Sequence, residues 1–163
     1  MTVNIRQAHV ADADQLAKLR WDFSFYYEEK PGPDELFEDF VVGFRPFVEQ
    51  ALASGKWAIW VAEEDGTLVS QMYVQRIDKV PRPGRFGKQY GYITNVYTLP
   101  EYRNNGIGTR LLRRVIAWAG EIDLELLIVW PSKDSREFYQ RQGFATNPGL
   151  YELGIEDSRM RRA

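Results

Sequence analysis

Apolar positions in this chain follow a two-residue period in some stretches and a three-to-four-residue period in others. The first period is typical of strands and the second of helices. Alternation over residues 3–8 predicts a first strand, and residues 16–27 and 34–51 carry apolar side chains at helical spacing. Gly43 and Pro46 interrupt the second helical stretch, so we expect a break or kink there, because proline disfavours a helix interior.

The middle of the chain predicts a hairpin followed by a further strand. Residues 57–63 and 67–80 are rich in β-branched and aromatic side chains, and Glu-Asp-Gly at 64–66 suits the turn between them. Residues 90–98 have a similar composition and predict the next strand.

The last third of the chain returns to helical spacing and then to a nearly continuous apolar run. Residues 106–119 predict an amphipathic helix, and residues 124–130 predict a strand buried on both faces. Residues 135–142 predict a short helix, with one or two final strands from Phe144 onward. This order of elements is typical of an α/β fold, and 163 residues match the usual length of one domain, which we expect over residues 1–163.

Composition narrows the classes of function. The chain has 21 Lys and Arg against 23 Asp and Glu, a formal net charge of −2, which argues against nucleic acid or an anionic membrane as partner. It has no cysteine and a single histidine, His9, so we expect neither disulfides nor a metal site built from these residues. No apolar run reaches the ~20 residues of a membrane span, and no signal peptide is recognisable, so we expect a cytoplasmic protein.

Residues 103–108, Arg-Asn-Asn-Gly-Ile-Gly, lie between a predicted strand and a predicted helix. The two glycines let the backbone approach a ligand closely, and the unpaired amides of a helix start attract phosphate oxygens. A turn without a ligand is one alternative. A dinucleotide fingerprint is weakened by Leu111 in place of a third glycine, and a Walker A loop is weakened because no lysine precedes Thr109.

Two blocks resemble the Gcn5-related N-acetyltransferase (GNAT) superfamily. Arg103-x-x-Gly106-x-Gly108, entered from Val-x-Thr-Leu-Pro-Glu-Tyr, resembles that family's motif A, and Phe138-Tyr139-x-x-x-Gly-Phe resembles its motif B. The blocks occur in the family order, and the resemblance covers essentially the whole chain. It implies a mixed, mostly antiparallel central sheet with helices on both faces, splayed between the fourth and fifth strands.

The resemblance also implies that acetyl-CoA binds as co-substrate, where strand 90–98 splays from strand 124–130. Backbone groups of strand 90–98 would pair with the pantetheine amides. The glycine-rich turn would hold the pyrophosphate, and Arg103 would add positive charge there. Serine at 132 departs from the asparagine that the family often has there, and the two serines instead suit helix caps. The implied cofactor-binding residues are Val96, Tyr97, Thr98, Arg103, Asn104, Asn105, Gly106, Ile107, Gly108, Thr109, Ser132 and Ser135.

Tyr139 matches the family's proton donor to the leaving thiolate, with a buried core aromatic as the alternative. A phenol of pKa ~10 can protonate a thiolate whose thiol titrates near ~8.5 if it lies within hydrogen-bond reach. The strand leading into motif A carries no carboxylate, so the general base is not identified. Thr94 and Asn95 are suited to orienting a water molecule, whereas Glu28, Glu29 and Asp134 fit solvated surface positions better than a base.

The expected activity is transfer of an acetyl group from acetyl-CoA to an amine of a small molecule or peptide, by direct attack through a tetrahedral intermediate, without a metal. A non-catalytic acyl-CoA-binding or regulatory module on the same fold is the alternative. A homodimer is one possible oligomeric state. The motifs do not specify the amine, because fold and cofactor motif do not determine the acceptor.

Overall fold

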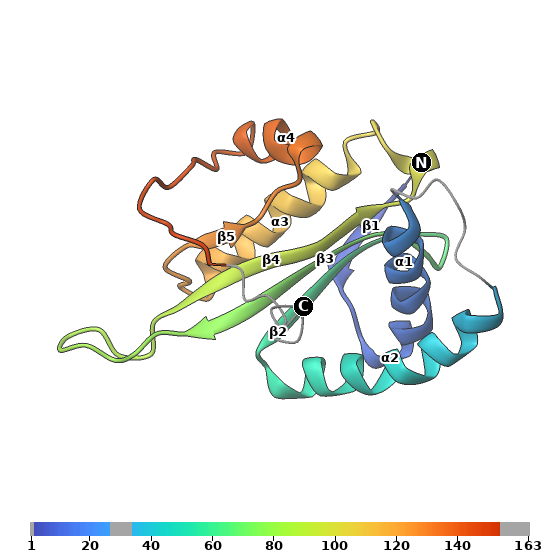
Figure 1. The fold of residues 1–163 in the computed structure, drawn as a ribbon, viewed down its shortest axis with the longest axis horizontal. Helices are drawn as coiled ribbons and strands as arrows, with labels where there is room; N and C mark the ends of the chain where they lie inside the picture. Colours follow the sequence, from blue (N-terminus) through green and yellow to red (C-terminus); the bar gives the residue numbers. More distant parts are fainter. Residues whose placement is uncertain (1, 27–33, 154–163) are drawn as a thin grey trace, which may run out of the picture. The chain divides into compact units, whose positions relative to one another are not determined.

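The computed structural model describes residues 2–26 and 34–153. The chain forms two compact units, Met1–Trp130 and Pro131–Ala163. The first unit holds a five-stranded sheet whose spatial order equals its chain order (Figure 1). Neighbouring strands are antiparallel except for the last pair, which is parallel, and this confirms a mixed, mostly antiparallel sheet. The strands are β1 (Asn4–Gln7), β2 (Trp57–Glu64), β3 (Thr67–Asp78), β4 (Gln89–Thr98) and β5 (Leu127–Val129).

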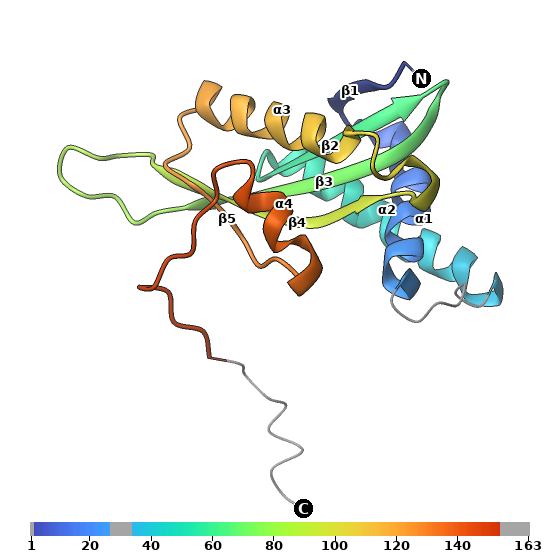
Figure 2. The same ribbon diagram turned by 90° about the horizontal axis from the view of Figure 1, so that it is seen from above.

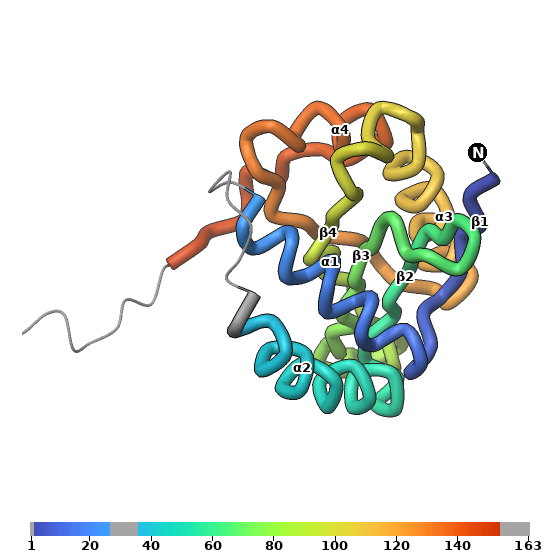
Figure 3. Tube along the Cα trace, turned by 90° about the vertical axis from the view of Figure 1, so that its right-hand side faces the viewer, coloured from blue at the N-terminus to red at the C-terminus, as the bar shows by residue number. Residues whose placement is uncertain are grey.

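Helices cover both faces of this sheet, as expected. The helices α1 (Ala13–Phe25) and α2 (Asp34–Ser54) lie on one face, and α3 (Ile107–Glu121) lies on the other (Figures 2 and 3). Short 3-10 turns, η1 (Val10–Asp12) and η3 (Pro100–Tyr102), precede α1 and α3. Among the described residues, no helix is both long and apolar enough to cross a membrane.

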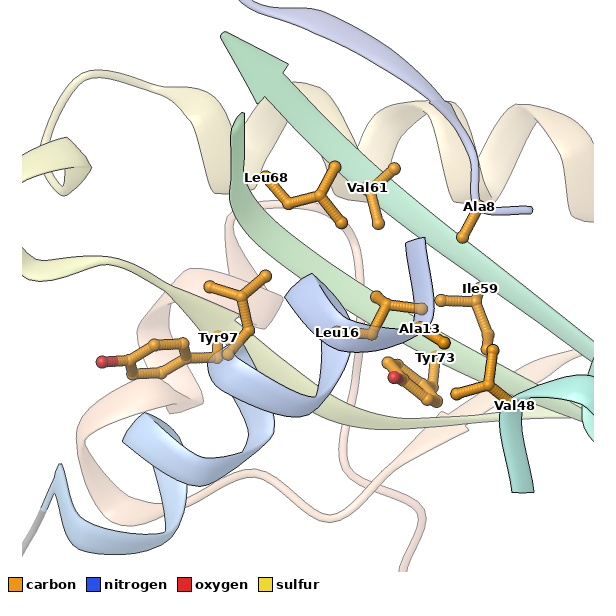
Figure 4. Packing of buried hydrophobic residues seen from close by; sticks show 10 residues of the cluster. Ala8, Ala13, Leu16, Val48, Ile59, Val61, Leu68, Tyr73 and Tyr97 are labelled. Atoms are coloured by element: carbon orange, nitrogen blue, oxygen red, sulfur yellow. The ribbon is translucent and has the colours of Figure 1, made fainter. Parts of the chain in front are cut away.

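The larger core cluster lies between α1, α2 and the sheet (Figure 4). Leu16 of α1 and Val48 of α2 are fully buried against Ile59 of β2 and Tyr73 of β3. Each such side chain stabilises the fold by about 1.5–3 kcal/mol relative to an exposed position. Tyr97 of β4 belongs to the same cluster, so this helix-covered face reaches the strand that carries the expected cofactor site.

A second cluster fixes the start of α3 on the opposite face. Ile107, the first residue of α3, is buried against Val3, Ala62 and Val69, which come from the N-terminal segment, β2 and β3. The apolar stripe predicted for this helix is therefore present, and it holds the glycine-rich turn next to the end of β4.

The break expected in the second helix is wrong, because α2 is continuous through Gly43 and Pro46. Proline at 46 removes the amide that would bond to the carbonyl of Val42, four residues earlier. Gly43 and Pro46 are exposed, and Val42 is 64% exposed, so water can bond to this carbonyl. The buried residues Val41 and Val48 keep the helix on the sheet on both sides of the proline.

The second unit contains η4 (Lys133–Ser135) and the short helix α4 (Arg136–Gln140). After α4 the chain turns at Gly143, which has a φ of 93°, and the Phe144 amide donates to the Tyr139 carbonyl at 3.2 Å. The structure shows no strand between residues 144 and 153, so the final strand expected from Phe144 onward is not found there. Residues 154–163 lie outside the described ranges.

Candidate active site

The strand β4 is paired along only part of its outer edge. It pairs with β5 from Gly91 to Ile93, and within the described residues of the first unit the edge from Thr94 to Thr98 has no strand partner. Glycine at 91 allows close packing, because a Cβ there would lie 2.7 Å from the Leu127 side chain, which would have to shift. The strand expected over residues 124–130 is shorter than predicted and only half-buried. Its early end leaves main-chain donors and acceptors of β4 available to a ligand.

A β-bulge lies where the pairing stops. Tyr73 of β3 faces Thr94, and Gln71 faces Tyr97, so two residues of β4 occupy the space opposite one residue of β3. One of the two, Asn95, has a φ of 48°, in the left-handed region. A bulge bends its strand and leaves the extra residue out of the ladder. The open edge that follows contains Val96, Tyr97 and Thr98, the residues expected to pair with pantetheine.

The turn after β4 presents unpaired amides. Asn104 and Gly106 have φ values of 61° and 73°, and Gly106 is the N-cap of α3. The Arg110 amide donates to the Gly106 carbonyl at 3.0 Å, so the amides that precede it in the helix have no carbonyl partner within α3. These donors and the positive end of the helix dipole form an arrangement that can hold a phosphate group.

The side chain of Arg103 makes its contacts on the α1 side of β4. Its Nε donates to the Thr98 carbonyl at 2.9 Å, and its guanidinium carbon lies 4.1 Å from the centre of the Tyr26 ring and 5.4 Å from that of Tyr97. Its backbone amide donates to the Pro100 carbonyl at 3.2 Å. The phosphate contact expected from Arg103 stays a prediction.

Unpartnered polar atoms belong to residues of β3 and β4 at and beside the bulge. Of five buried side-chain polar atoms without a hydrogen bond in the described ranges, four belong to Gln71, Tyr73 and Asn95. Gln71 contributes both Oε1 and Nε2, and its side chain is fully buried. Burial raises the pKa of Tyr73, and the Arg20 charge acts in the opposite direction. An unpartnered buried polar group costs about 1–3 kcal/mol, so this cluster calls for a physical explanation.

Gln71 is a candidate site residue that the sequence pattern did not single out. It occupies the middle of β3, in a run of buried residues from Leu68 to Val74. A glutamine at such a position is unusual, because glutamine is mostly exposed in folded proteins. That signal was available in the sequence, although the absence of a partner for the carboxamide becomes visible only in the folded structure.

In the second unit, Tyr139 is buried, and its ring centre lies 5.0 Å from that of Phe138 and 5.5 Å from that of Phe144. Burial raises the pKa of Tyr139 to about 12, so the phenol is protonated at neutral pH, as a proton donor must be. Ser132 donates to the Ser135 hydroxyl at 3.0 Å, and Ser135 donates to the Ser132 carbonyl at 3.1 Å. Neither serine side chain caps a helix amide. The roles expected of these three residues stay predictions.

The remaining titratable candidates lie apart from this arrangement or outside the described ranges. His9 is exposed at the start of η1, and its backbone amide donates to Asp12 at 2.9 Å. Asp134 is exposed, and Glu28 and Glu29 lie outside the described residues. No group of three or more His, Asp or Glu side chains within the described ranges is arranged to hold a metal ion.

Comparison with known proteins finds a matching family. Residues 13–144 match the profile of the Acetyltransferase (GNAT) family. A Bacillus subtilis protein named as an uncharacterized N-acetyltransferase is 25% identical over 91% of this chain and 93% of its own length. A Methanocaldococcus jannaschii protein with the same description is 24% identical over 68% of this chain, which spans only 55% of that relative.

A solved structure agrees with this family match. A Clostridium acetobutylicum protein described as a predicted acetyltransferase, and solved with acetyl-CoA, is 29% identical. Its TM-score is 0.74, and the match covers 94% of this chain and 96% of that one. The open edge of β4, the amide-rich turn and these matches agree, and the chain belongs to the GNAT family of acetyltransferases.

Proposed function

We propose that the protein transfers the acetyl group of acetyl-CoA to an amine of a small molecule or peptide. The amine nitrogen attacks the thioester carbonyl, and the tetrahedral intermediate collapses with cleavage of the carbon–sulfur bond. The CoA thiolate leaves and takes up one proton, while the amine nitrogen releases one. The observation that carries this proposal is the unpaired edge of β4 beside the unpaired amides at the start of α3.

Acetyl-CoA fits this arrangement as an added strand that ends in a phosphate site. The backbone of Val96, Tyr97 and Thr98 would pair with the two pantetheine amides, as peptides pair with open sheet edges. The amides of residues 104–109 would hold the pyrophosphate. A backbone amide near Val96 would then stabilise the oxyanion that forms at the thioester carbon. A similar protein, from Clostridium acetobutylicum, was solved with acetyl-CoA, which supports this choice of ligand.

The two proton transfers need separate groups. Tyr139 is proposed to protonate the leaving thiolate, with Ser132 and Ser135 beside the pantetheine. The amine proton would leave through water, because β4 has no carboxylate and the amides and phenol of Gln71, Tyr73 and Asn95 are poor bases at neutral pH. These polar groups lie at and beside the β4 bulge, where a polar group of the acceptor would satisfy them.

Thermal unfolding with acetyl-CoA tests the cofactor site. Ligand at 100 times its Kd should raise the free energy of unfolding by about 2.7 kcal/mol. Gly108→Glu should abolish this shift, because a carboxylate would occupy the phosphate site. Gly43→Glu is the matched control, since Gly43 is exposed in α2 with open space around its Cβ position, and it should keep the shift. Normal binding by the Gly108 variant would refute this placement.

Thiol release from acetyl-CoA with a panel of amines tests the reaction itself. The panel should include amino acids, polyamines, aminoglycosides and peptides with free N-termini. Turnover with at least one of them is expected. Tight binding of acetyl-CoA without turnover across the panel would contradict the proposed enzyme and would favour an acyl-CoA-binding module.

A further inference from the structure

One arginine connects three parts of the first unit. Arg103 begins the amide-rich turn, its Nε donates to the carbonyl of Thr98 at the end of β4, and its guanidinium stacks on Tyr26, the residue that follows α1. The distance of 4.1 Å from the guanidinium carbon to the centre of the Tyr26 ring is the shortest such cation–π distance among the described residues. The Arg103 side chain therefore links the cofactor turn to the C-terminal end of α1.

The Tyr26 end of α1 is less firmly packed than the rest of the helix. Leu16, Ala17 and Leu19 are fully or almost fully buried, whereas Phe25 is only half-buried and Tyr26 is 42% exposed. Helix ends with few buried contacts open more readily than helix middles. The order of this last turn therefore depends on the groups that contact it, and the Arg103 guanidinium is one of them.

The turn itself is joined to Arg103. The side-chain amide of Asn105 donates to the Arg103 carbonyl at 3.1 Å, and the following residues lead directly into α3. A ligand that binds the amides of residues 104–109 would restrict the backbone of this turn, and with it the starting point of the Arg103 side chain. The guanidinium would then stay over the Tyr26 ring for a larger fraction of the time.

We propose that Arg103 is a positioning residue that couples CoA binding at the turn to the order of the last turn of α1. This inference rests on the proposed function, because it requires CoA to bind at residues 104–109. Tyr97 and Tyr73, which lie on the α1 side of the sheet, place the polar cluster on that side as well. An amine that approaches the thioester from this side would therefore pass the last turn of α1, the part of the helix that CoA binding would order.

Hydrogen–deuterium exchange with CoA alone tests the coupling and needs no knowledge of the amine. In the parent protein, saturating CoA should slow exchange of the amides of residues 22–26 at least threefold. Arg103→Met should remove this effect even at CoA concentrations that saturate the variant. Tyr26→Phe keeps the ring face and should retain the effect, whereas Tyr26→Leu should lose it. Arg114→Met is the matched control, because Arg114 stacks on Trp60 at 4.7 Å, between α3 and β2.

The outcomes separate this inference from the proposed function. If the parent protein shows no melting shift with CoA, the proposed cofactor site is wrong and the coupling fails with it. If CoA binds and exchange at residues 22–26 does not change, or if Arg103→Met keeps the full effect, the coupling alone is refuted. A tenfold or larger loss of CoA affinity in Arg103→Met, with slowed exchange retained at saturation, would overturn it by making Arg103 a phosphate ligand.

Discussion

Replacing Gln71 with methionine should make the protein more stable. The Gln71 side chain is fully buried in β3, and neither its Oε1 nor its Nε2 has a hydrogen-bond partner among the described residues. Methionine has a similar length and no branch, so it fills the same space without polar atoms. Removing an unpartnered buried polar group should recover about 1–3 kcal/mol of unfolding free energy. In a chain of this size each kcal/mol raises the Tm by about 2–4 °C.

Urea unfolding of the ligand-free protein measures this effect, and the same substitution at Gln15 is the control. The Gln15 carboxamide is fully used, because its Nε2 donates to the Gly66 carbonyl at 3.1 Å and its Oε1 accepts from the Leu68 amide at 2.8 Å. Gln15→Met should therefore lower the unfolding free energy by about 1–2 kcal/mol. The two variants should change stability in opposite directions, although the chemical change is identical.

Gln71→Met should lower activity although it raises stability. If the polar cluster serves the amine side of the reaction, Gln71→Met should lower kcat/KM for the amine found in the panel and leave acetyl-CoA affinity unchanged. A loss of unfolding free energy above 1 kcal/mol in Gln71→Met would refute the reasoning, since it would mean that the carboxamide has a partner in solution. Full activity in a stabilised Gln71→Met variant would show that the polar cluster takes no part in the reaction and is only a packing defect.

Two further predictions concern protons. Tyr139→Phe should lower turnover ~10²–10⁴-fold and leave acetyl-CoA binding nearly unchanged, as steady-state and binding assays would show; turnover within threefold of the parent would exclude the acid role. Burial by itself raises the Asp12 pKa, but hydrogen bonds from Arg6 and from the His9 amide outweigh it and hold that pKa below its usual value. Because its pKa is lowered in the folded state, Asp12 stabilises the protein above about pH 4, and this contribution is lost as the pH falls. Asp12→Asn should therefore weaken the fall of the unfolding free energy with decreasing pH, measured by urea unfolding at a series of pH values. An unchanged slope of unfolding free energy against pH would contradict this.

The spacing of apolar residues and the turn residues were sufficient to predict those helices and strands that tertiary contacts do not alter. The hairpin of β2 and β3 and the amphipathic helix α3 follow from residue spacing and turn chemistry, and their observed bounds lie close to those expected. Pro46 shows the opposite case. Its cost in a helix depends on whether water reaches the freed carbonyl, and that depends on which side of α2 packs on the sheet.

The site was predictable as a turn and a strand edge but not as a set of side-chain contacts. Glycines at 106 and 108 before a helix fit a ligand-binding turn as well as a turn without a ligand, and the resemblance of the two motifs to the family favoured the first. The direction of the Arg103 side chain and the missing partners of Gln71 arise from residues distant in the chain. Tyr26 is 77 positions before Arg103 (103 − 26), so no local pattern joins them.

The open edge of β4 has a consequence for solubility. An unpaired strand edge can recruit a strand of another molecule, and native proteins often protect such edges with bulges that prevent regular pairing. Here the bulge at Asn95 lies where the open edge begins and breaks the even spacing that a long partner strand would need. A short, flexible ligand with two amides needs only the few residues after the bulge, whereas a long partner strand needs regular pairing on both sides of it. The same distortion that shapes the cofactor edge therefore protects the ligand-free protein against edge-to-edge aggregation.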